Sequence, residues 1–240
     1  YLVSKQLNTL DFLKELEHRT LFDVRTPAEY EKGHIPIALN LPLFSNEERV
    51  VVGTIYKKES PEAAMLKGLE YVGPKMRDFV VEASAKCNDK PIAVHCWRGG
   101  KRSQSMAWLL NTVGNDVVTL KGGYKAYRNH LLSQFAERQL NIITLGGRTG
   151  CGKTKILHAL KDAGEQVIDL EGLANHKGSS FGWIGEKEQP SVEHFENLLF
   201  DEDYDGTGTY ATPGVGGGDE PYYELSVETP DGKSPTTIDV

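Results

Sequence analysis

One cysteine of the sequence stands in a setting that favours nucleophilic chemistry. Cys96 follows the apolar segment Pro91–His95 and precedes a segment with helical spacing, so its sulfur is expected at a helix N-terminus. There the helix dipole and free backbone N–H groups stabilise a thiolate. Such a thiolate can attack and carry sulfur or selenium. The loop also contains cationic side chains, and its glycines let backbone amides turn inward towards an anion. The expected anion-binding residues are Trp97, Arg98, Gly99, Gly100, Lys101, Arg102 and Ser103.

The same loop also fits a different reaction. His95 and Cys96, followed by five residues and then Arg102, match the signature spacing of cysteine phosphatases, in which the thiolate attacks phosphorus. Such an enzyme needs a general acid near the cysteine, and the sequence does not identify one. Both chemistries therefore stay open, beside the plainer interpretation of Cys96 as a structural thiol among surface cations.

A second segment has the pattern of a phosphate-binding loop. It reads Gly-x4-Gly-Lys-Thr, follows the expected strand Leu140–Leu145 and opens the expected helix Lys153–Ala163. Backbone N–H groups of such a loop wrap phosphate oxygens, its lysine neutralises them, and its threonine can hold Mg²⁺. The predicted phosphate-binding residues are Gly147, Arg148, Thr149, Gly150, Cys151, Gly152, Lys153 and Thr154, with Mg²⁺ at Thr154.

Efficient ATP hydrolysis would need a further acidic group beside that loop. Asp169, in the expected strand Gln166–Leu170, could serve only if its strand lies next to Leu140–Leu145. Residues 140–200 also form a thin sheet at best. The sequence therefore favours binding of a diphosphate over hydrolysis of ATP.

The elements that must position these loops alternate between strand and helix. This order predicts an α/β fold with a parallel sheet. The expected strands are Leu21–Val24, Ala38–Leu41, Pro91–His95 and Val117–Leu120. The expected helices are Pro27–Lys32, Glu62–Tyr71, Lys75–Lys86, Gln104–Thr112 with Ser103 as its N-cap, and Tyr124–Phe135.

Three segments follow from this pattern: a first α/β domain at residues 1–136, a phosphate-loop domain at 137–200, and a tail at 201–240. The tail is rich in Gly, Thr and Pro, and we expect it to be poorly ordered or foreign, with Tyr222–Val227 as a candidate strand. It holds ten acidic side chains and one basic one, Lys233. The whole chain has 27 basic and 34 acidic residues and a net charge of −7. Subtracting the tail leaves 26 basic and 24 acidic residues in 1–200, a balance compatible with RNA binding.

Cysteine usage and hydrophobicity bear on the cellular compartment. Three cysteines, Cys87, Cys96 and Cys151, are too few and too irregularly spaced for a disulfide framework or a zinc site. The first six residues lack a secretory pattern, and no apolar run approaches the roughly 20 residues of a membrane span. These features predict a cytoplasmic protein with no resident metal and no membrane association.

The first domain resembles the rhodanese family. Residues 22–42 look like the N-terminal signature of rhodanese domains, and the Cys96 loop and the turn Gly122-Gly123-Tyr124 match later landmarks of that fold. The resemblance implies structural roles for Asp23 and Arg25 and a turn-stabilising role for His34.

The order of the two loops resembles the tRNA 2-selenouridine synthase family. The matching segments lie at residues 96–103, 120–128, 145–154 and 169–182. This resemblance implies a rhodanese-like domain followed by a partial P-loop NTPase-like domain. It implies a transferase that replaces sulfur by selenium in wobble 2-thiouridine of tRNA through a geranylated intermediate. Selenophosphate and geranyl diphosphate would be co-substrates, no cofactor would be tightly bound, and a selenophosphate-producing enzyme would be a partner.

Residue roles carry over from the same resemblance. Cys96 would handle the sulfur or selenium, and Gly147–Thr154 would hold the diphosphate of the prenyl donor. Lys121, Lys125 and Arg128, with the loop cations, could hold tRNA phosphates. The family pattern stops at residue 201, so three alternatives stay open: a generic rhodanese-type sulfurtransferase, a cysteine phosphatase, and a non-catalytic tRNA-binding fragment.

Overall fold

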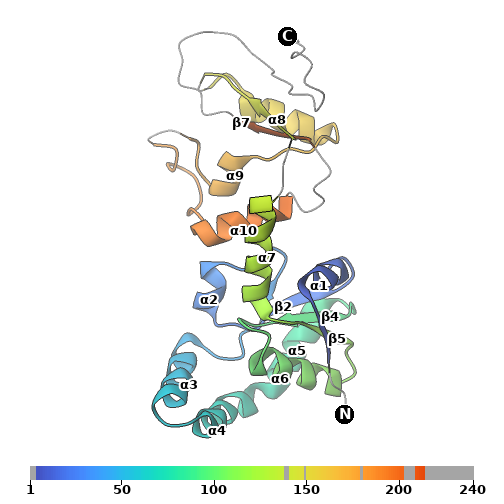
Figure 1. The fold of residues 1–240 in the computed structure, drawn as a ribbon, viewed down its shortest axis with the longest axis vertical. Coiled ribbons are helices and arrows are strands. Elements are labelled where there is room, and N and C mark those ends of the chain that lie inside the picture. Colours follow the sequence, from blue (N-terminus) through green and yellow to red (C-terminus); the bar gives the residue numbers. More distant parts are fainter. Residues whose placement is uncertain (1–3, 138–140, 149, 179–180, 203–208, 214–240) are drawn as a thin grey trace. The chain divides into compact units, whose positions relative to one another are not determined.

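The chain folds into two compact units, Tyr1–Ala136 and Glu137–Val240 (Figure 1). The structure is a computed structural model, and it describes residues 4–137, 141–148, 150–178, 181–202 and 209–213. No helix among the described residues is both long and apolar enough to cross a membrane.

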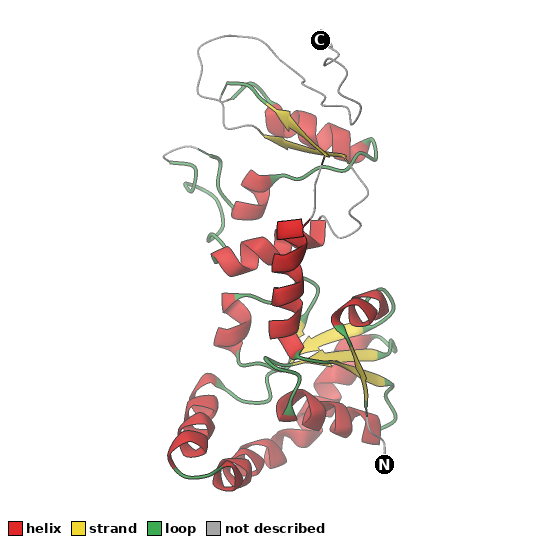
Figure 2. Ribbon diagram, in the orientation of Figure 1, coloured by secondary structure: helices red, strands yellow, loops and turns green. Residues whose placement is uncertain are grey.

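A five-stranded parallel sheet forms the centre of the first unit (Figure 2). Its strands are β1 (Lys5–Leu7), β2 (Thr20–Asp23), β3 (Leu39–Asn40), β4 (Ile92–His95) and β5 (Val117–Leu120), in the order β1-β5-β4-β2-β3. All four residues of the central strand β4 are buried, as expected for a parallel sheet covered on both faces. The predicted α/β class is confirmed.

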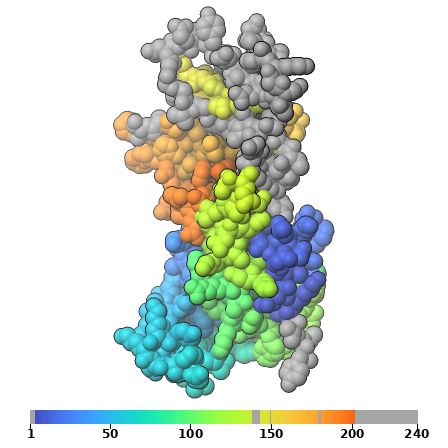
Figure 3. Space-filling model, viewed as in Figure 1, coloured from blue at the N-terminus to red at the C-terminus, as the bar shows by residue number. Residues whose placement is uncertain are grey.

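Helices surround this sheet. They are α1 (Thr9–Glu15), α2 (Pro27–Lys32), α3 (Asn46–Lys58), α4 (Pro61–Val72), α5 (Met76–Cys87), α6 (Lys101–Thr112) and α7 (Gly123–Glu137), with a 3-10 turn at Gly73–Lys75. Residues of α5 and α6 close the core over the central strands, among them Phe79, Met106 and Leu110. The helices α3 and α4 pack on each other and project at one end of the unit (Figure 3).

Sequence reasoning missed three elements of this unit, β1, α1 and α3. Helix α3 was hidden by three consecutive valines, which are typical of strands, and by Gly53. A signal for it was present, because Ser45 and Glu48 form a capping box in which each side chain accepts a hydrogen bond from the other's backbone N–H.

The start of α6 also differs from the prediction. Ser103 was expected to cap a helix beginning at Gln104, but α6 begins at Lys101 with Gly100 at its N-cap. Ser103 is therefore a residue of the first turn, fully buried, and its hydroxyl donates to the Gly100 carbonyl oxygen at 3.1 Å. The prediction of a Ser103 cap was wrong because the glycines let the loop turn into the helix earlier.

The second unit contains a pair of parallel strands, β6 (Asn141–Leu145) and β7 (Thr209–Pro213), in register from Asn141 opposite Thr209. Its helices are α8 (Lys153–Asp162), α9 (Leu170–Ala174) and α10 (Val192–Glu202). Leu145, Leu157 and Val167 form a small core.

One expectation for this unit was wrong. The segment Gln166–Leu170 is not a strand, since Val167 makes only an isolated bridge and Leu170 begins α9. Within the stretch 201–240, expected to be poorly ordered or foreign, β7 pairs with β6 along five residues. Strand pairing of this kind depends on a distant partner, which local composition does not reveal. The candidate strand Tyr222–Val227 lies outside the described residues.

Candidate active site

Cys96 lies at the carboxyl end of the central strand β4, immediately before the loop that leads into α6. Its side chain is buried, and its Sγ lies 3.2 Å from the Ser103 hydroxyl oxygen. Because Ser103 belongs to the first turn of α6, the sulfur sits where the helix N-terminus favours a negative charge. Ligand-binding residues of open parallel sheets typically occupy this edge.

The loop after Cys96 presents many unused donors. Among the described residues, the backbone N–H groups of residues 98–103 donate to no carbonyl or side-chain acceptor. Buried or half-buried amides in this state are suited to receive an anion or a thiolate. The anion-binding role of Trp97, Arg98, Gly99, Gly100, Lys101, Arg102 and Ser103 stays a prediction, with which the unpaired N–H groups of residues 98–103 agree.

The loop is held in shape by the first turn of α7. The N–H groups of Tyr124 and Lys125 donate to the carbonyl oxygens of Cys96 and Trp97 at 2.8 and 3.0 Å. Gly123 is buried with a φ of +62°. A Cβ atom there would collide with the Cys96 carbonyl oxygen and the Gly99 nitrogen. A glycine is therefore required for the close approach of the two backbones.

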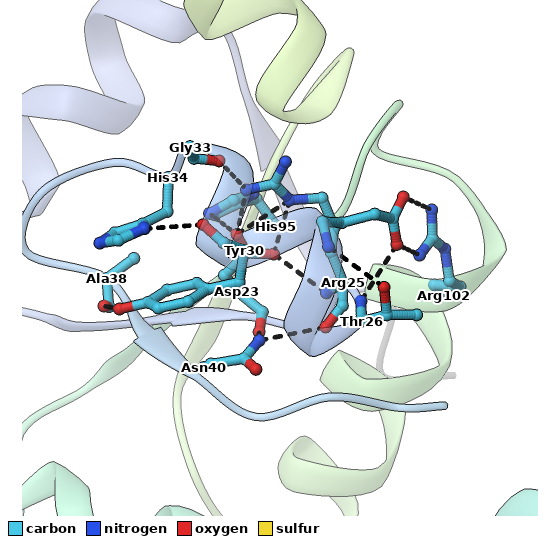
Figure 4. A network of polar contacts seen from close by, with 11 residues as sticks. Asp23, Arg25, Thr26, Tyr30, Gly33, His34, Ala38, Asn40, His95 and Arg102 are labelled. Carbon is cyan, nitrogen blue, oxygen red and sulfur yellow. Dashed lines mark hydrogen bonds and ion pairs between the residues drawn. The ribbon is translucent and has the colours of Figure 1, made fainter. Parts of the chain in front are cut away.

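A buried polar network lies beneath the loop (Figure 4). The Arg25 guanidinium pairs with the Asp23 carboxylate at 2.5 Å, donates to the Gly33 carbonyl oxygen at 2.7 Å, and stacks on the ring of Tyr124. Both charged side chains are almost fully buried, and the Arg25 guanidinium carbon lies 6.0 Å from the ring centroid of Trp97 in the loop. The network thus joins α2 to β2, in keeping with the structural roles expected for Asp23 and Arg25.

His95 belongs to the same network and precedes the cysteine. Its Nε2 lies 3.7 Å from Asp23 Oδ2, and its side chain is completely buried. Burial is the main cause that lowers the pKa of His95 to about 4, so the ring is neutral at pH 7.

His34 stabilises the turn after α2, as expected. Its ring stacks on Tyr30 with centroids 3.7 Å apart, and its Nδ1 lies 2.9 Å from the Tyr30 carbonyl oxygen. The hydroxyl of Tyr30 donates to the Ala38 carbonyl oxygen at 2.7 Å, which ties the turn to the start of β3.

Glu29 is a site residue that sequence reasoning missed. Its carboxylate binds the Arg102 guanidinium through both oxygens, at 2.7 and 3.2 Å. The available signal was the Thr26-x-x-Glu29 capping box at the start of α2, which places this carboxylate beside the sheet edge. Nothing in the sequence pattern pairs it with a side chain of α6.

Exposed cations surround the loop. Arg98, Lys101, Lys121 and Lys125 are exposed and, within the described part of the chain, make no ion pair. Lys101 also borders a shallow hollow of about 330 Å³ lined by Met65, Lys101, Gln104, Ser105 and Trp108. The indole of Trp108 is exposed, so an aromatic face, an amide, a hydroxyl and a cation meet on one side of α6.

The phosphate-binding loop of the second unit joins β6 to α8, the context that its motif requires. The Lys153 ammonium donates to the carbonyl oxygens of Gly147 and Arg148 at 2.8 and 3.0 Å, so the side chain folds back over the loop. A Cβ atom at Gly147 would lie 2.8 Å from Cys151 Sγ, so a side chain there would require that sulfur to move. Thr149 lies outside the described residues.

Asp169, considered above as an acidic group for ATP hydrolysis, does not lie on a strand. It is the N-cap of α9, where its Oδ1 accepts from the Gly172 N–H at 3.0 Å, and its Oδ2 lies 3.7 Å from His158 Nε2. The strand on which that role depended is therefore not formed by residues 166–170.

The segment after α9 is tied to residues further along the chain. Asn175 donates from Nδ2 to the Glu188 carbonyl oxygen at 2.8 Å, and Lys177 pairs with Glu186 at 2.5 Å. These contacts give Asn175 and Lys177 a role in shaping the segment 175–188.

Comparison with known proteins finds a matching domain family for each unit. Residues 8–130 match the rhodanese-like domain, and residues 140–207 match the tRNA 2-selenouridine synthase AAA domain. The second match extends beyond residue 201, where the sequence had suggested that the resemblance stops.

Curated relatives agree with both matches. A tRNA 2-selenouridine synthase of Sulfurovum sp. is 44% identical over 189 residues, which cover 77% of this chain and 50% of the relative. The Hydrogenovibrio crunogenus synthase is 42% identical over 194 residues, covering 77% and 52%. The chain thus spans about half the length of the curated relatives it matches. The resemblance stated from the sequence is confirmed.

A solved structure covers the first unit. It is the N-terminal domain of a Clostridium difficile 630 protein described as ATP/GTP-binding, with 42% identity and a TM-score of 0.49, covering 53% of this chain and 99% of that one.

Proposed function

Because the chain belongs to the rhodanese-like family through residues 8–130, and both of its units match tRNA 2-selenouridine synthases, we propose that it is a tRNA-modifying transferase. It replaces sulfur by selenium in wobble 2-thiouridine, through a geranylated intermediate. The observation that carries the proposal is the succession, in one chain, of a buried cysteine in an amide-rich loop and a phosphate loop.

The phosphate loop would take part in the prenyl step. The sulfur of 2-thiouridine attacks the first carbon of geranyl diphosphate, a carbon–sulfur bond forms, the carbon–oxygen bond breaks, and diphosphate leaves. Amides of Gly147–Thr154 and the Lys153 ammonium are suited to hold that diphosphate. Mg²⁺ at Thr154 would add further countercharge when bound.

Cys96 would take part in the selenium step. Its thiolate adds to C2 of the geranylated base, the bond from C2 to the geranyl sulfur breaks, and geranylthiol leaves with a proton. Water attacks the phosphorus of selenophosphate, so that a P–O bond forms as the P–Se bond breaks, and phosphate and selenide are released. The selenide then forms a bond to C2 and displaces the Cys96 thiolate. No atom changes its oxidation state, so the sequence of steps needs no external oxidant.

The proposed macromolecular substrate is tRNA. The exposed cations Arg98, Lys101, Lys121 and Lys125 can hold phosphates beside the cysteine loop. The hollow next to Lys101 offers Trp108 for stacking of an unpaired base and the polar groups of Gln104 and Ser105 for its edge. A cytoplasmic location and an association with a selenophosphate-producing enzyme belong to the same proposal.

Mass spectrometry of wobble nucleosides tests the proposal. Thiolated tRNA, selenophosphate and geranyl diphosphate are incubated with the wild-type protein, the Cys96→Ala variant or the Lys153→Ala variant. The variants Cys87→Ala and Lys155→Ala are the matched controls. We expect selenouridine from wild type and both controls, none from Cys96→Ala, and loss of geranyl-thiouridine with Lys153→Ala. If the Cys96→Ala variant forms selenouridine at the wild-type level, the proposed role of the thiol is contradicted.

A generic rhodanese-type sulfurtransferase is the second candidate, favoured by the match of residues 8–130 alone. Here Cys96 attacks the outer sulfur of thiosulfate, forms a persulfide and releases sulfite. Release of sulfite from thiosulfate, with a persulfide on Cys96 and no modified nucleoside, would favour this candidate. Retention of tRNA without either reaction would favour a binding fragment.

A further inference from the structure

Arg102, the arginine of the cysteine loop, has its guanidinium already engaged. Two of its nitrogens bind the two oxygens of Glu29, Nη1 to Oε2 at 2.7 Å and Nη2 to Oε1 at 3.2 Å. The side chains are only 16% and 29% exposed, so water competes weakly for this pair. We call these two guanidinium nitrogens, Nη1 and Nη2, the Arg102 fork. Two parallel hydrogen bonds from such a fork to one carboxylate are the strong form of an arginine–carboxylate contact.

Glu29 is itself fixed by the start of α2. Its Oε2 accepts from the Thr26 N–H at 3.0 Å, while its own N–H donates to the Thr26 hydroxyl at 3.3 Å. Burial raises the pKa of the Glu29 carboxyl, but the hydrogen bond and charge of Arg102 outweigh burial and hold that pKa below its ordinary value. The carboxylate is therefore ionised at neutral pH and cannot leave Arg102 without undoing the helix cap.

This arrangement matters for the alternative chemistry of the loop. A cysteine loop that cleaves phosphate esters needs its arginine to grip two phosphoryl oxygens at once. In this chain the same two guanidinium nitrogens already hold a carboxylate. An incoming phosphate would meet the free amides of residues 98–103 but not the fork of Arg102.

We propose that Glu29 is a specificity-determining positioning residue that withholds the Arg102 fork from phosphate and so reserves the Cys96 loop for sulfur and selenium. The sulfur and selenium half of this inference rests on the proposed function. It also gives the pair a purpose in that function, because phosphate is released with selenide and would otherwise occupy the loop.

Alkylation of Cys96 by iodoacetamide, followed on its own peptide by mass spectrometry, tests the inference. Inorganic phosphate is titrated as the protecting ligand against wild type and Glu29→Gln. We expect the apparent phosphate affinity of the loop to rise at least about tenfold in Glu29→Gln, since the freed fork can then make a paired contact. In the double variant Glu29→Gln/Arg102→Lys the gain should vanish, because an ammonium cannot bind two oxygens in this way.

Glu48→Gln is the matched control. Glu48 also accepts from its capping residue, Ser45 N–H at 2.8 Å, and also pairs with a cation, Lys75 at 2.6 Å, but neither residue belongs to the Cys96 loop. Its phosphate protection should equal that of wild type, and thermal melting establishes that all variants fold.

Equal phosphate affinity of wild type and Glu29→Gln would overturn the inference, as would a gain that persists in the double variant. The assay contains no tRNA, selenophosphate or geranyl diphosphate. The phosphate-protection assay can therefore be interpreted even if the proposed function is wrong. A negative result in it does not change the interpretation of the nucleoside assay.

Discussion

Gly99 and Gly123 approach each other so closely that neither position has room for a side chain. A Cβ atom at Gly99 would lie 3.0 Å from the Gly123 nitrogen and 2.8 Å from the Gly122 nitrogen. Both glycines also have positive φ, +64° and +62°. This contact holds the cysteine loop against the first turn of α7, so the conformation of the loop depends on residues of both segments.

Gly123→Ala should therefore destabilise the first unit. A Cβ at this position meets backbone atoms that cannot move aside, and the positive φ adds strain, so we expect a loss of at least about 2 kcal/mol in the free energy of unfolding. Urea denaturation measures it. Gly100→Ala is the control in the same loop, because a Cβ there meets nothing within 4 Å and its φ is −97°. Equal losses in both variants would contradict the close contact.

Removing one partner of the buried pair Asp23–Arg25 should be more damaging than changing an exposed pair. The side chains are 0% and 1% exposed, so Arg25→Met leaves the Asp23 carboxylate buried without its partner, at a cost of about 3–5 kcal/mol. Lys86→Met, which breaks the exposed pair with Glu82, should change stability by less than about 1 kcal/mol. Denaturant midpoints compare the two, and a small effect of Arg25→Met would speak against the network in Figure 4.

The protein should lose stability between pH 6.5 and pH 4. The pKa of His95 falls from 6.5 to about 4 on folding, so the unfolded chain binds more protons in this window. The contribution of the neutral ring is complete above pH 6.5 and is lost as the pH falls towards 4, by about 3 kcal/mol in all. Urea unfolding at pH 7, 6 and 5 measures the slope. In His95→Asn the slope over this window should flatten, and an unchanged slope would assign it to other groups.

Trp108→Ala should weaken RNA binding if the hollow beside Lys101 receives a base. Loss of one stacking contact lowers affinity about tenfold, which fluorescence anisotropy of a labelled anticodon stem-loop would detect. Trp183→Ala removes an indole that is exposed to a similar degree, 61% against 53%, but belongs to the second unit. If Trp108→Ala binds the stem-loop with the same affinity as Trp183→Ala, the hollow is not a base-binding site.

Lys153→Ala should weaken binding of inorganic diphosphate about 10- to 100-fold, because the ammonium is the cation that lies over the loop carbonyls. Isothermal titration calorimetry measures the Kd. Lys155→Ala changes an exposed cation of the same helix turn and should leave the Kd within about twofold. A loss common to both variants would indicate general charge attraction instead of a specific phosphate contact.

Several features follow from local sequence alone. The alternation of strand and helix predicted the parallel sheet, because each buried strand reads as a short apolar run between turn residues. Cys96 after one such run and Lys153 in its glycine-rich loop were placed correctly for the same reason, since strand, loop and helix follow each other directly in the chain. Helix α2 was located by Pro27 and Gly33, which favour a start and an end.

Other features depend on the tertiary structure. Glu29 meets Arg102, Gly99 meets Gly123, and β7 pairs with β6, although each pair is separated by intervening elements. A parallel sheet brings together residues from distant crossovers, and no local preference of either partner specifies the other. The sequence by itself thus determined which side chains are candidates for the chemistry. Packing decided that Arg102 is held by a carboxylate and that Ser103 contacts the sulfur, because those contacts exist only between elements that the fold brings together.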